Sequence, residues 1–245
     1  MSHLSAGSLT LVCPVYNEAE NMPKLLERLA ADVRTPFELS VIYDRDDDTT
    51  LLALENVDAR YHFTIRRVKN RYGHGALHAV MTGLEAADGI AAAVIMADLA
   101  DDLTIVDQMY RLIVEDGYDL AAGSRYMPGG RQIGGPALKG MLSRLAGKTL
   151  HILTGIPTCD VTNNFKMYRT SMLRDIRIES RAGFEIAMEL TVKAYARGYR
   201  ITEIPSVWRD RSAGVSRFRL WKWMPYYLRW YWYALCNLRT REKTP

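Results

Sequence analysis

Several polar residues stand directly after apolar stretches of the chain. They are Tyr16, Glu18, Asp44, Asp98 and Arg125. Carboxylates accept hydrogen bonds and can bind cations, and a guanidinium can bind a phosphate through two parallel hydrogen bonds. Each acidic loop taken alone is also compatible with a solvated turn, because Asp is a common turn residue. Their joint meaning depends on whether the fold brings them together.

The pattern of apolar residues predicts alternating strands and helices. Buried strands are predicted at residues 9–14, 37–43, 64–68, 90–96 and 120–123. One helical pattern opens at Asn17-Glu18. Two further helices are predicted at residues 76–87 and 105–114. This order predicts an α/β fold with a Rossmann-like, mostly parallel sheet and helices on both faces. Because the carboxyl ends of parallel strands line the ligand crevice, the five polar residues should gather at one sheet edge.

The composition is that of an ordinary globular protein. Of 245 residues, 48% are hydrophobic and 24% are charged, which excludes a disordered chain, a collagen-like repeat and a disulfide scaffold. No run approaches the roughly 20 apolar residues that span a bilayer, which excludes a polytopic membrane protein. The three cysteines, Cys13, Cys159 and Cys236, are widely spaced and no signal peptide is visible, so a reducing cytosol is expected.

Several common catalytic motifs are missing from the sequence. Neither a Walker glycine loop nor a Gly-x-Gly-x-x-Gly follows the first predicted strand, which argues against a P-loop kinase and a dehydrogenase. No Ser or Cys stands in a nucleophile elbow. The five histidines show no metal-ligand constellation.

Residues 209–245 are basic and aromatic. They hold nine Lys/Arg against two Asp/Glu, a net charge of +7, while the whole chain carries only +4, so an anionic partner is expected. Four of the five tryptophans lie here, and Trp223–Cys236 is predicted to be a helix with Pro225 in its first turn. These 14 residues would extend about 21 Å, short of the roughly 30 Å hydrocarbon core of a bilayer.

The aromatic and basic character of this helix predicts its partner. Trp and Tyr prefer the headgroup boundary, and flanking Arg and Lys suit anionic lipids, so we expect a helix lying in the plane of a membrane surface. The alternative is an aromatic helix packed on the core or on a second subunit. Nucleic acid is not expected as a partner, because the rest of the chain offers no binding module.

Six short motifs occur in a fixed order between Leu9 and Arg217. They are Pro14-Val-Tyr-Asn-Glu18, Gly117-Tyr-Asp-Leu-Ala-Ala-Gly-Ser-Arg-Tyr126, Ser143-Arg144, Asp160-Val-Thr-Asn-Asn-Phe-Lys-Met-Tyr168, Gly183-Phe-Glu185 and Asp210-Arg-Ser-Ala-Gly-Val-Ser-Arg217. The series resembles family 2 glycosyltransferases, which have the GT-A fold, and within them the polyprenyl-phosphate sugar synthases, a branch that includes the dolichyl-phosphate mannose synthases. The resemblance implies an inverting transfer of a hexose, with mannose favoured, from a nucleotide-diphosphate sugar to a polyprenyl phosphate.

The resemblance also implies a nucleotide site at the first two strand ends. Pro14, Tyr16, Glu18 and Asp44 take the family's positions there, with Tyr16 packing on or beside the base and Asp44 accepting a hydrogen bond from a ring N–H. The chain departs from the family in having Tyr43-Asp44 where two consecutive acids are usual. The donor's base therefore stays open between GDP-mannose and UDP-glucose.

The implied metal motif is incomplete. The family places Asp-x-Asp at the end of the fourth strand to hold Mg²⁺ or Mn²⁺ on the donor diphosphate, whereas this chain has Met96-Ala-Asp98. A thioether is a poor ligand for a hard cation, so Asp98 is expected to bind the metal, with a second oxygen from Asp101 or Asp102, directly or through water, and with Asp101 favoured. The alternative for Asp101 and Asp102 is capping of the helix that begins near Thr104.

The implied acceptor needs positive charge more than a base. A phosphate monoester is largely dianionic at neutral pH, so it can attack the anomeric carbon without losing a proton. Arg125, Arg144 and Arg211 match the family positions that hold the acceptor phosphate, although a surface salt bridge is the alternative for each. Ser216-Arg217 matches the family's Ser-Lys, in a loop that closes over the donor diphosphate.

Two other functions remain open on the sequence. A soluble hydroxyl acceptor would need a carboxylate base, for which Glu185 or Asp160 could serve. A degenerate module that binds a nucleotide sugar without turnover is favoured only by Met96. The leading hypothesis divides the chain into a catalytic domain, 1–218, and an interfacial helix with a basic tail, 219–245. It locates the protein in the cytoplasm, peripheral on the cytosolic face of a membrane, bound directly or through a separate membrane-anchored partner.

Overall fold

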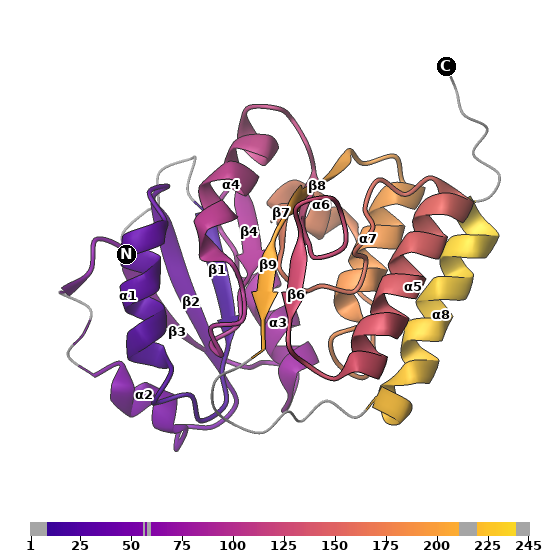
Figure 1. Cartoon of the computed structure of the whole chain (residues 1–245). Coiled ribbons are helices and arrows are strands. Elements are labelled where there is room, and N and C mark those ends of the chain that lie inside the picture. Colours follow the sequence, from indigo (N-terminus) through magenta and orange to yellow (C-terminus); the bar gives the residue numbers. More distant parts are fainter. Residues whose placement is uncertain (1–8, 56, 58–59, 211–219, 239–245) are drawn as a thin grey trace.

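Seven strands form the central sheet of the protein, in the order β3-β2-β1-β4-β7-β5-β8 (Figure 1). The computed structural model describes residues 9–55, 57, 60–210 and 220–238. The strands are β1 Leu9–Pro14, β2 Phe37–Tyr43, β3 Thr64–Lys69, β4 Ala91–Val94, β5 Leu120–Ser124, β7 Lys166–Arg169 and β8 Ile201–Pro205. All pairs are parallel except those of β7 with β4 and β5. The predicted mostly parallel sheet is confirmed.

Helices cover both faces of this sheet. On one face Leu25, Leu26 and Leu29 of α1 (Met22–Asp32) pack with α4 (Val106–Val114), which follows the 3-10 helix η2 (Leu103–Ile105). The opposite face is covered by α3, α6 and α7. Their bounds are α3 Ala76–Glu85, α6 Thr170–Asp175 and α7 Ile186–Ala196, and the short α2 is Thr49–Ala53. The helices pack here because α1 presents leucines at helical spacing, and because β1 is buried throughout and β2 at every residue but its last.

A third hydrophobic cluster lies beside the sheet, between α7 and a pair of neighbouring helices, α5 (Ala137–Thr154) and α8 (Leu220–Leu238) (Figure 1). Trp230, Ala234 and Leu238 of α8 are buried in it. The predicted limits of this helix were wrong: it has 19 residues, and Pro225 lies inside it instead of in the first turn. At 1.5 Å per residue it extends about 28 Å. Within the described part of the chain, no helix combines the length and hydropathy of a membrane span.

A small second sheet was not predicted from the sequence. It pairs β6 (Arg131–Ile133) with β9 (Val207–Arg209) in parallel. The backbone N–H of Arg209 also donates to the carbonyl of Ala100 at 3.0 Å. This sheet therefore connects the turn after β4 to the segment that follows β5.

Candidate active site

The residues predicted for the nucleotide line one cavity of about 890 Å³ at the carboxyl edge of the sheet. Its wall includes Pro14, Tyr16, Glu18, Asp44 and Asp98. Tyr16 is 41% exposed and is therefore available to a ligand. The parallel strands thus bring together residues that are more than 80 positions apart in sequence. Their individual roles stay predictions.

Asp44 is held by the loop that leads into α3. Its carboxylate accepts hydrogen bonds from the Asn70 side chain and from the backbone N–H of Gly75, each at 2.8 Å. Gly75 has a φ of 109°, a conformation that residues with a Cβ rarely adopt. Both carboxylate oxygens of Asp44 therefore already accept a hydrogen bond within the protein. An N–H of the donor's nucleobase that binds Asp44 would share one of these oxygens, which restricts the direction from which the nucleobase approaches.

A tight turn after β4 presents two carboxylates. Asp98 Oδ1 accepts from the N–H of Ala100 at 3.2 Å, and Asp101 Oδ2 accepts from the N–H of Met96 at 2.9 Å. Leu99 between them has a φ of 63°, unusual for a residue other than glycine. Asp102 instead accepts from the Val207 N–H and the Thr104 hydroxyl, and it does not cap the helix backbone.

The carboxylate pair suits a hard divalent cation. Burial of Asp101 and the neighbouring Asp98 charge raise the pKa of Asp101 to about 7, so a bound cation would relieve both effects. Among the described residues no three His, Cys, Asp or Glu side chains converge on one metal position. The remaining ligands would have to be water or phosphate oxygens, which is how Mg²⁺ commonly binds. Met96 lines the cavity but offers only its thioether.

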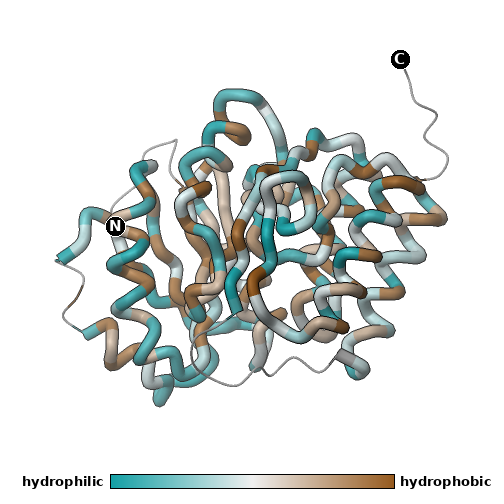
Figure 2. Tube along the Cα trace, viewed as in Figure 1, coloured by the Kyte–Doolittle hydropathy of each residue, from teal (hydrophilic) through white to brown (hydrophobic). Residues whose placement is uncertain are grey.

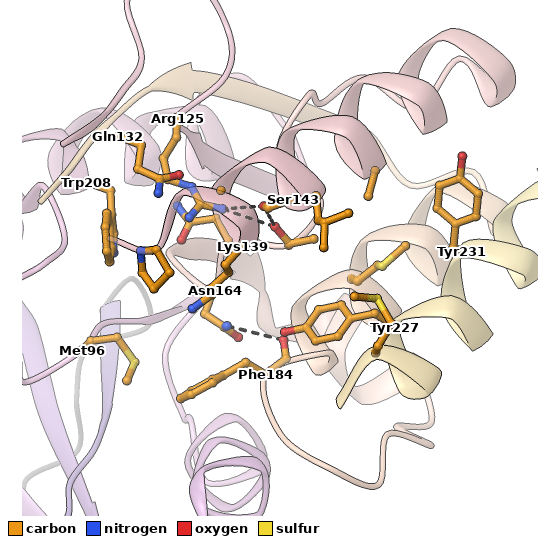
Figure 3. Close-up of a pocket in the computed structure, with 18 of the residues that line it drawn as sticks. Met96, Arg125, Gln132, Lys139, Ser143, Asn164, Phe184, Trp208, Tyr227 and Tyr231 are labelled. Carbon is orange, nitrogen blue, oxygen red and sulfur yellow. Dashed lines mark hydrogen bonds between the residues drawn. The ribbon is translucent and has the colours of Figure 1, made fainter. Parts of the chain in front are cut away.

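A second cavity of about 210 Å³ begins at the same turn and extends toward α8 (Figure 3). Asp98, Asp101 and Arg125 line its polar end. The guanidinium of Arg125 is largely engaged inside the protein: Nε and Nη2 donate to the carboxylate of Asp160 at 2.7 and 2.9 Å. Nη2 also donates to Thr162 at 3.2 Å. The guanidinium was predicted to donate two parallel hydrogen bonds to a phosphate, but it donates them mainly to a buried carboxylate.

Lys139 was missed by the sequence analysis. It lies in the first turn of α5 and lines both cavities, together with Met96, Asp98 and Phe184. Arg144 lines neither cavity; it is exposed, with its guanidinium over the ring of Tyr126 at 5.2 Å. The i, i+4 spacing of Lys139 and Ser143 puts both on one helix face and turns Arg144 away from it. That spacing is the signal that could have found Lys139.

The sequence profile of glycosyl transferase family 2 matches residues 10–177. The chain belongs to this family. It is 31% identical over 216 residues to the polyprenol monophosphomannose synthase of Mycolicibacterium smegmatis, covering 84% of this chain and 79% of that protein. It is 26% identical to the dolichol-phosphate mannosyltransferase of Pyrococcus furiosus, covering 86% of this chain but only 59% of that protein.

The fold is shared with solved GT-A enzymes. Glucosyl-3-phosphoglycerate synthase from Mycobacterium tuberculosis, in complex with Mn²⁺, UDP and glucosyl-3-phosphoglycerate, superimposes with a TM-score of 0.66 at 16% identity, covering 98% of this chain and 82% of the other. TarS (residues 1–349) from S. aureus in complex with UDP gives 0.66 at 17% identity, covering 96% and 67%. These likenesses establish the GT-A fold.

The two carboxylates considered as bases for this family 2 glycosyltransferase are sequestered. Asp160 is fully buried against Arg125, and it lines neither cavity. Glu185 is also fully buried and accepts from the backbone N–H groups of residues 181, 182 and 183. A general base must reach the acceptor hydroxyl. This geometry therefore argues against a hydroxyl acceptor activated by either residue.

Helix α8 contributes to both cavities of the glycosyltransferase. Trp223 lines the larger one, packed edge-on against Phe184 with ring centroids 5.9 Å apart. Tyr227, Leu228 and Tyr231 line the smaller one. The aromatic and basic character of this helix predicted a membrane surface, and its place in the site was not predicted. Arg211, Ser216 and Arg217 lie outside the described residues.

Proposed function

We propose that this glycosyltransferase moves a hexose, most specifically mannose, from a nucleotide-diphosphate sugar to a polyprenyl phosphate with inversion at the anomeric carbon. The names of the two similar proteins, a polyprenol monophosphomannose synthase and a dolichol-phosphate mannosyltransferase, support this proposal. The observation that carries it is the smaller cavity, which is polar at one end and apolar at the other.

The cavity matches the two chemically different parts of such an acceptor. Its polar end carries Asp98, Arg125 and Lys139 beside the donor cavity. Its other walls come from α5, α7 and α8 and are mainly apolar: Leu142, Ala146, Met188, Met224, Tyr227, Leu228 and Tyr231. Leu228 is also 46% exposed, so this apolar wall reaches the protein surface. A phosphate at the polar end would leave a prenyl chain between α5 and α8 (Figure 3).

The proposed reaction needs little covalent help from the protein. An acceptor phosphate oxygen forms a bond to the anomeric carbon while the bond to the donor diphosphate breaks, and the nucleoside diphosphate leaves. Asp98 and Asp101 would hold a divalent cation, which when bound supplies positive charge to the leaving diphosphate. Lys139 neutralises the approaching acceptor, and the apolar walls exclude water that would compete as a nucleophile.

Product analysis tests this function. The full chain is incubated with Mn²⁺, a polyprenyl phosphate in detergent, and radiolabelled GDP-mannose or UDP-glucose. We expect label in an organic-phase product that mild acid releases as the free sugar, with GDP-mannose the better donor. Label transferred only to water-soluble acceptors, or no transfer from either donor, would overturn the proposal.

Lys139 is predicted to bind the acceptor phosphate. Changing Lys139→Met should raise the KM for the lipid phosphate about 10- to 100-fold, because a charged hydrogen bond is worth about 1.5–3 kcal/mol. Arg144→Met on the same helix is the matched control and should keep a near-normal KM, since Arg144 lines neither cavity. If initial-rate kinetics gave a raised KM for Arg144→Met and a normal KM for Lys139→Met, Arg144 and not Lys139 would be the residue that binds the acceptor phosphate.

We propose that α5 and α8 also form the membrane-binding surface. Neither helix contains an Asp or a Glu, and both carry Lys and Arg. Their exposed apolar side chains are Leu138, Met141, Leu145, Ile152, Leu153, Trp221, Tyr226, Leu228 and Trp232. Figure 2 shows hydrophobic positions along both helices at this edge of the molecule. Such a surface suits the interface of an anionic bilayer, where the acceptor resides.

Charge placed in that surface should weaken vesicle binding. We expect the double variant Leu145→Glu/Trp232→Glu to lose most co-sedimentation with phosphatidylglycerol vesicles, because both side chains are more than half exposed and would meet lipid. Leu52→Glu is the control: Leu52 is 67% exposed, on α2 at the opposite edge (Figure 1). Equal binding by all three proteins would contradict the proposed surface.

A further inference from the structure

The turn that carries Asp98 and Asp101 is held from outside at three consecutive carbonyls. The guanidinium of Arg28 donates from Nη1 to the Leu99 carbonyl at 3.0 Å and from Nη2 to the Asp101 carbonyl at 3.1 Å. The backbone N–H of Arg209 donates to the carbonyl of Ala100 between them at 3.0 Å. Arg28 lies on α1, about 70 residues before the turn in sequence.

The turn has physical reasons to change shape without this support. Leu99 adopts a left-handed backbone conformation, with a φ of 63°, that is strained for a residue with a Cβ. Asp98 and Asp101 place two carboxylates close together, and Asp101 is only 5% exposed. Like charges in a partly buried site repel each other strongly. The two hydrogen bonds from one rigid, planar group fix the spacing of the Leu99 and Asp101 carbonyls.

Arg28 itself stands behind the site. It lines neither cavity, and its salt bridge with Asp32, 3.9 Å away on the same helix, is a loose one. Its backbone is fixed because Leu25, Leu26 and Leu29 of α1 are fully buried against the sheet. The well-packed helix thus offers a rigid base from which the side chain reaches the turn.

We infer that Arg28 is a positioning residue that holds the Asp98–Asp101 turn in the shape that binds the metal–diphosphate part of the donor. The inference rests on the proposed function, since it takes Asp98 and Asp101 as the metal ligands. Arg28 touches neither donor nor acceptor. Its loss should therefore weaken metal binding most and disturb the acceptor site less, because Lys139 lies on α5 and not on this turn.

Direct measurement of Mn²⁺ binding tests this role. Electron paramagnetic resonance titration of the full chain with Mn²⁺ in the presence of GDP gives the affinity without turnover. We expect Arg28→Met to weaken Mn²⁺ binding about 10- to 100-fold, as the loss of an outer-shell partner commonly does. The KM for lipid phosphate should rise much less than the dissociation constant for Mn²⁺, and saturating Mn²⁺ should restore most of kcat. Arg28→Lys, which keeps the charge but not the planar fork, should give an intermediate loss.

Lys24→Met provides the matched control, because it removes an exposed cation from the same helix one turn away. Wild-type Mn²⁺ affinity in a folded Arg28→Met protein would overturn the positioning role. If Arg28→Met fails to fold, wild-type affinity in Arg28→Lys would overturn the need for the fork. Asp98→Asn separates the two proposals. Unchanged Mn²⁺ binding by Asp98→Asn would refute the metal site itself. If Asp98→Asn loses Mn²⁺ binding while Arg28→Met binds Mn²⁺ normally, only the positioning role of Arg28 is refuted.

Discussion

Changing Asp98→Asn should lower kcat by about 100-fold or more, the size of effect expected when one preorganised electrostatic partner of a transition state is lost. Asp98 lines both cavities, so its carboxylate lies where donor and acceptor would meet. Asn keeps the size of the side chain but removes the charge that a cation on the diphosphate requires. Initial rates at saturating donor and acceptor, with Mn²⁺ varied, measure the effect.

Asp102→Asn is the control for this change. It makes the same substitution four residues further along, in a side chain that accepts from Val207 and Thr104 and lines neither cavity. We expect its kcat to stay within a few-fold of wild type. Excess EDTA should abolish wild-type activity. A nearly normal Asp98→Asn enzyme, or full activity in EDTA, would refute the assignment of Asp98 to a metal site.

The first half of the fold could be predicted because its signals are local. β1 and β2 begin and end at the predicted residues, since each is a mainly apolar run, interrupted only by Thr10, Glu38 and Ser40, that stops at a proline or an acidic loop. Parallel pairing then sends each strand end to the same edge. Tyr16, Asp44 and Asp98 could therefore be grouped in advance.

The second half of the site depends on contacts that sequence patterns do not encode. The partner of Arg125 is Asp160, 35 residues away and buried, so the guanidinium looked available when read from its motif alone. Lys139 was overlooked because its helix, α5, was not predicted: many of its apolar residues are exposed, which blurs the helical periodicity. Arg28 carried no motif, since its role comes from hydrogen bonds to backbone carbonyls.

Helix α8 shows a mixed outcome for a related reason. Its aromatic residues were assigned to a membrane surface, with packing on the core as the alternative. The helix has both kinds of face: Trp230 is 2% exposed, while Trp232 is 62% exposed. The spacing of Trp230, Ala234 and Leu238 at every fourth residue is the signal of the buried face. Removing α8 would therefore remove buried side chains from the core and wall residues from both cavities. Point variants are for this reason the better test of its role at a membrane surface.

Removing the carboxylate of Asp160 should destabilise the protein strongly. Asp160→Asn would leave the Arg125 guanidinium buried without its counter-charge, a situation that costs about 3–5 kcal/mol in the free energy of unfolding. The pair is nearly solvent-free: the side chain of Asp160 is fully buried, and that of Arg125 is 10% exposed. Urea denaturation of wild type and variant at neutral pH measures the difference. Asp175→Asn, in the exposed pair with Arg197, is the control and should cost no more than about 1 kcal/mol.

The same pair predicts how stability depends on pH. Burial raises the pKa of Asp160, but the charge and hydrogen bonds of Arg125 outweigh it, so the pKa is held below its ordinary value. A carboxyl with a lowered folded pKa stabilises the protein above its unfolded pKa, about 3.9 for Asp, and this contribution disappears as the pH falls toward the folded pKa. Wild type should therefore lose more stability than Asp160→Asn between about pH 5 and pH 3. Parallel pH profiles, or a neutral-pH difference below 1 kcal/mol, would show that Arg125 does not depend on Asp160. Its guanidinium would then be free to turn toward an acceptor phosphate.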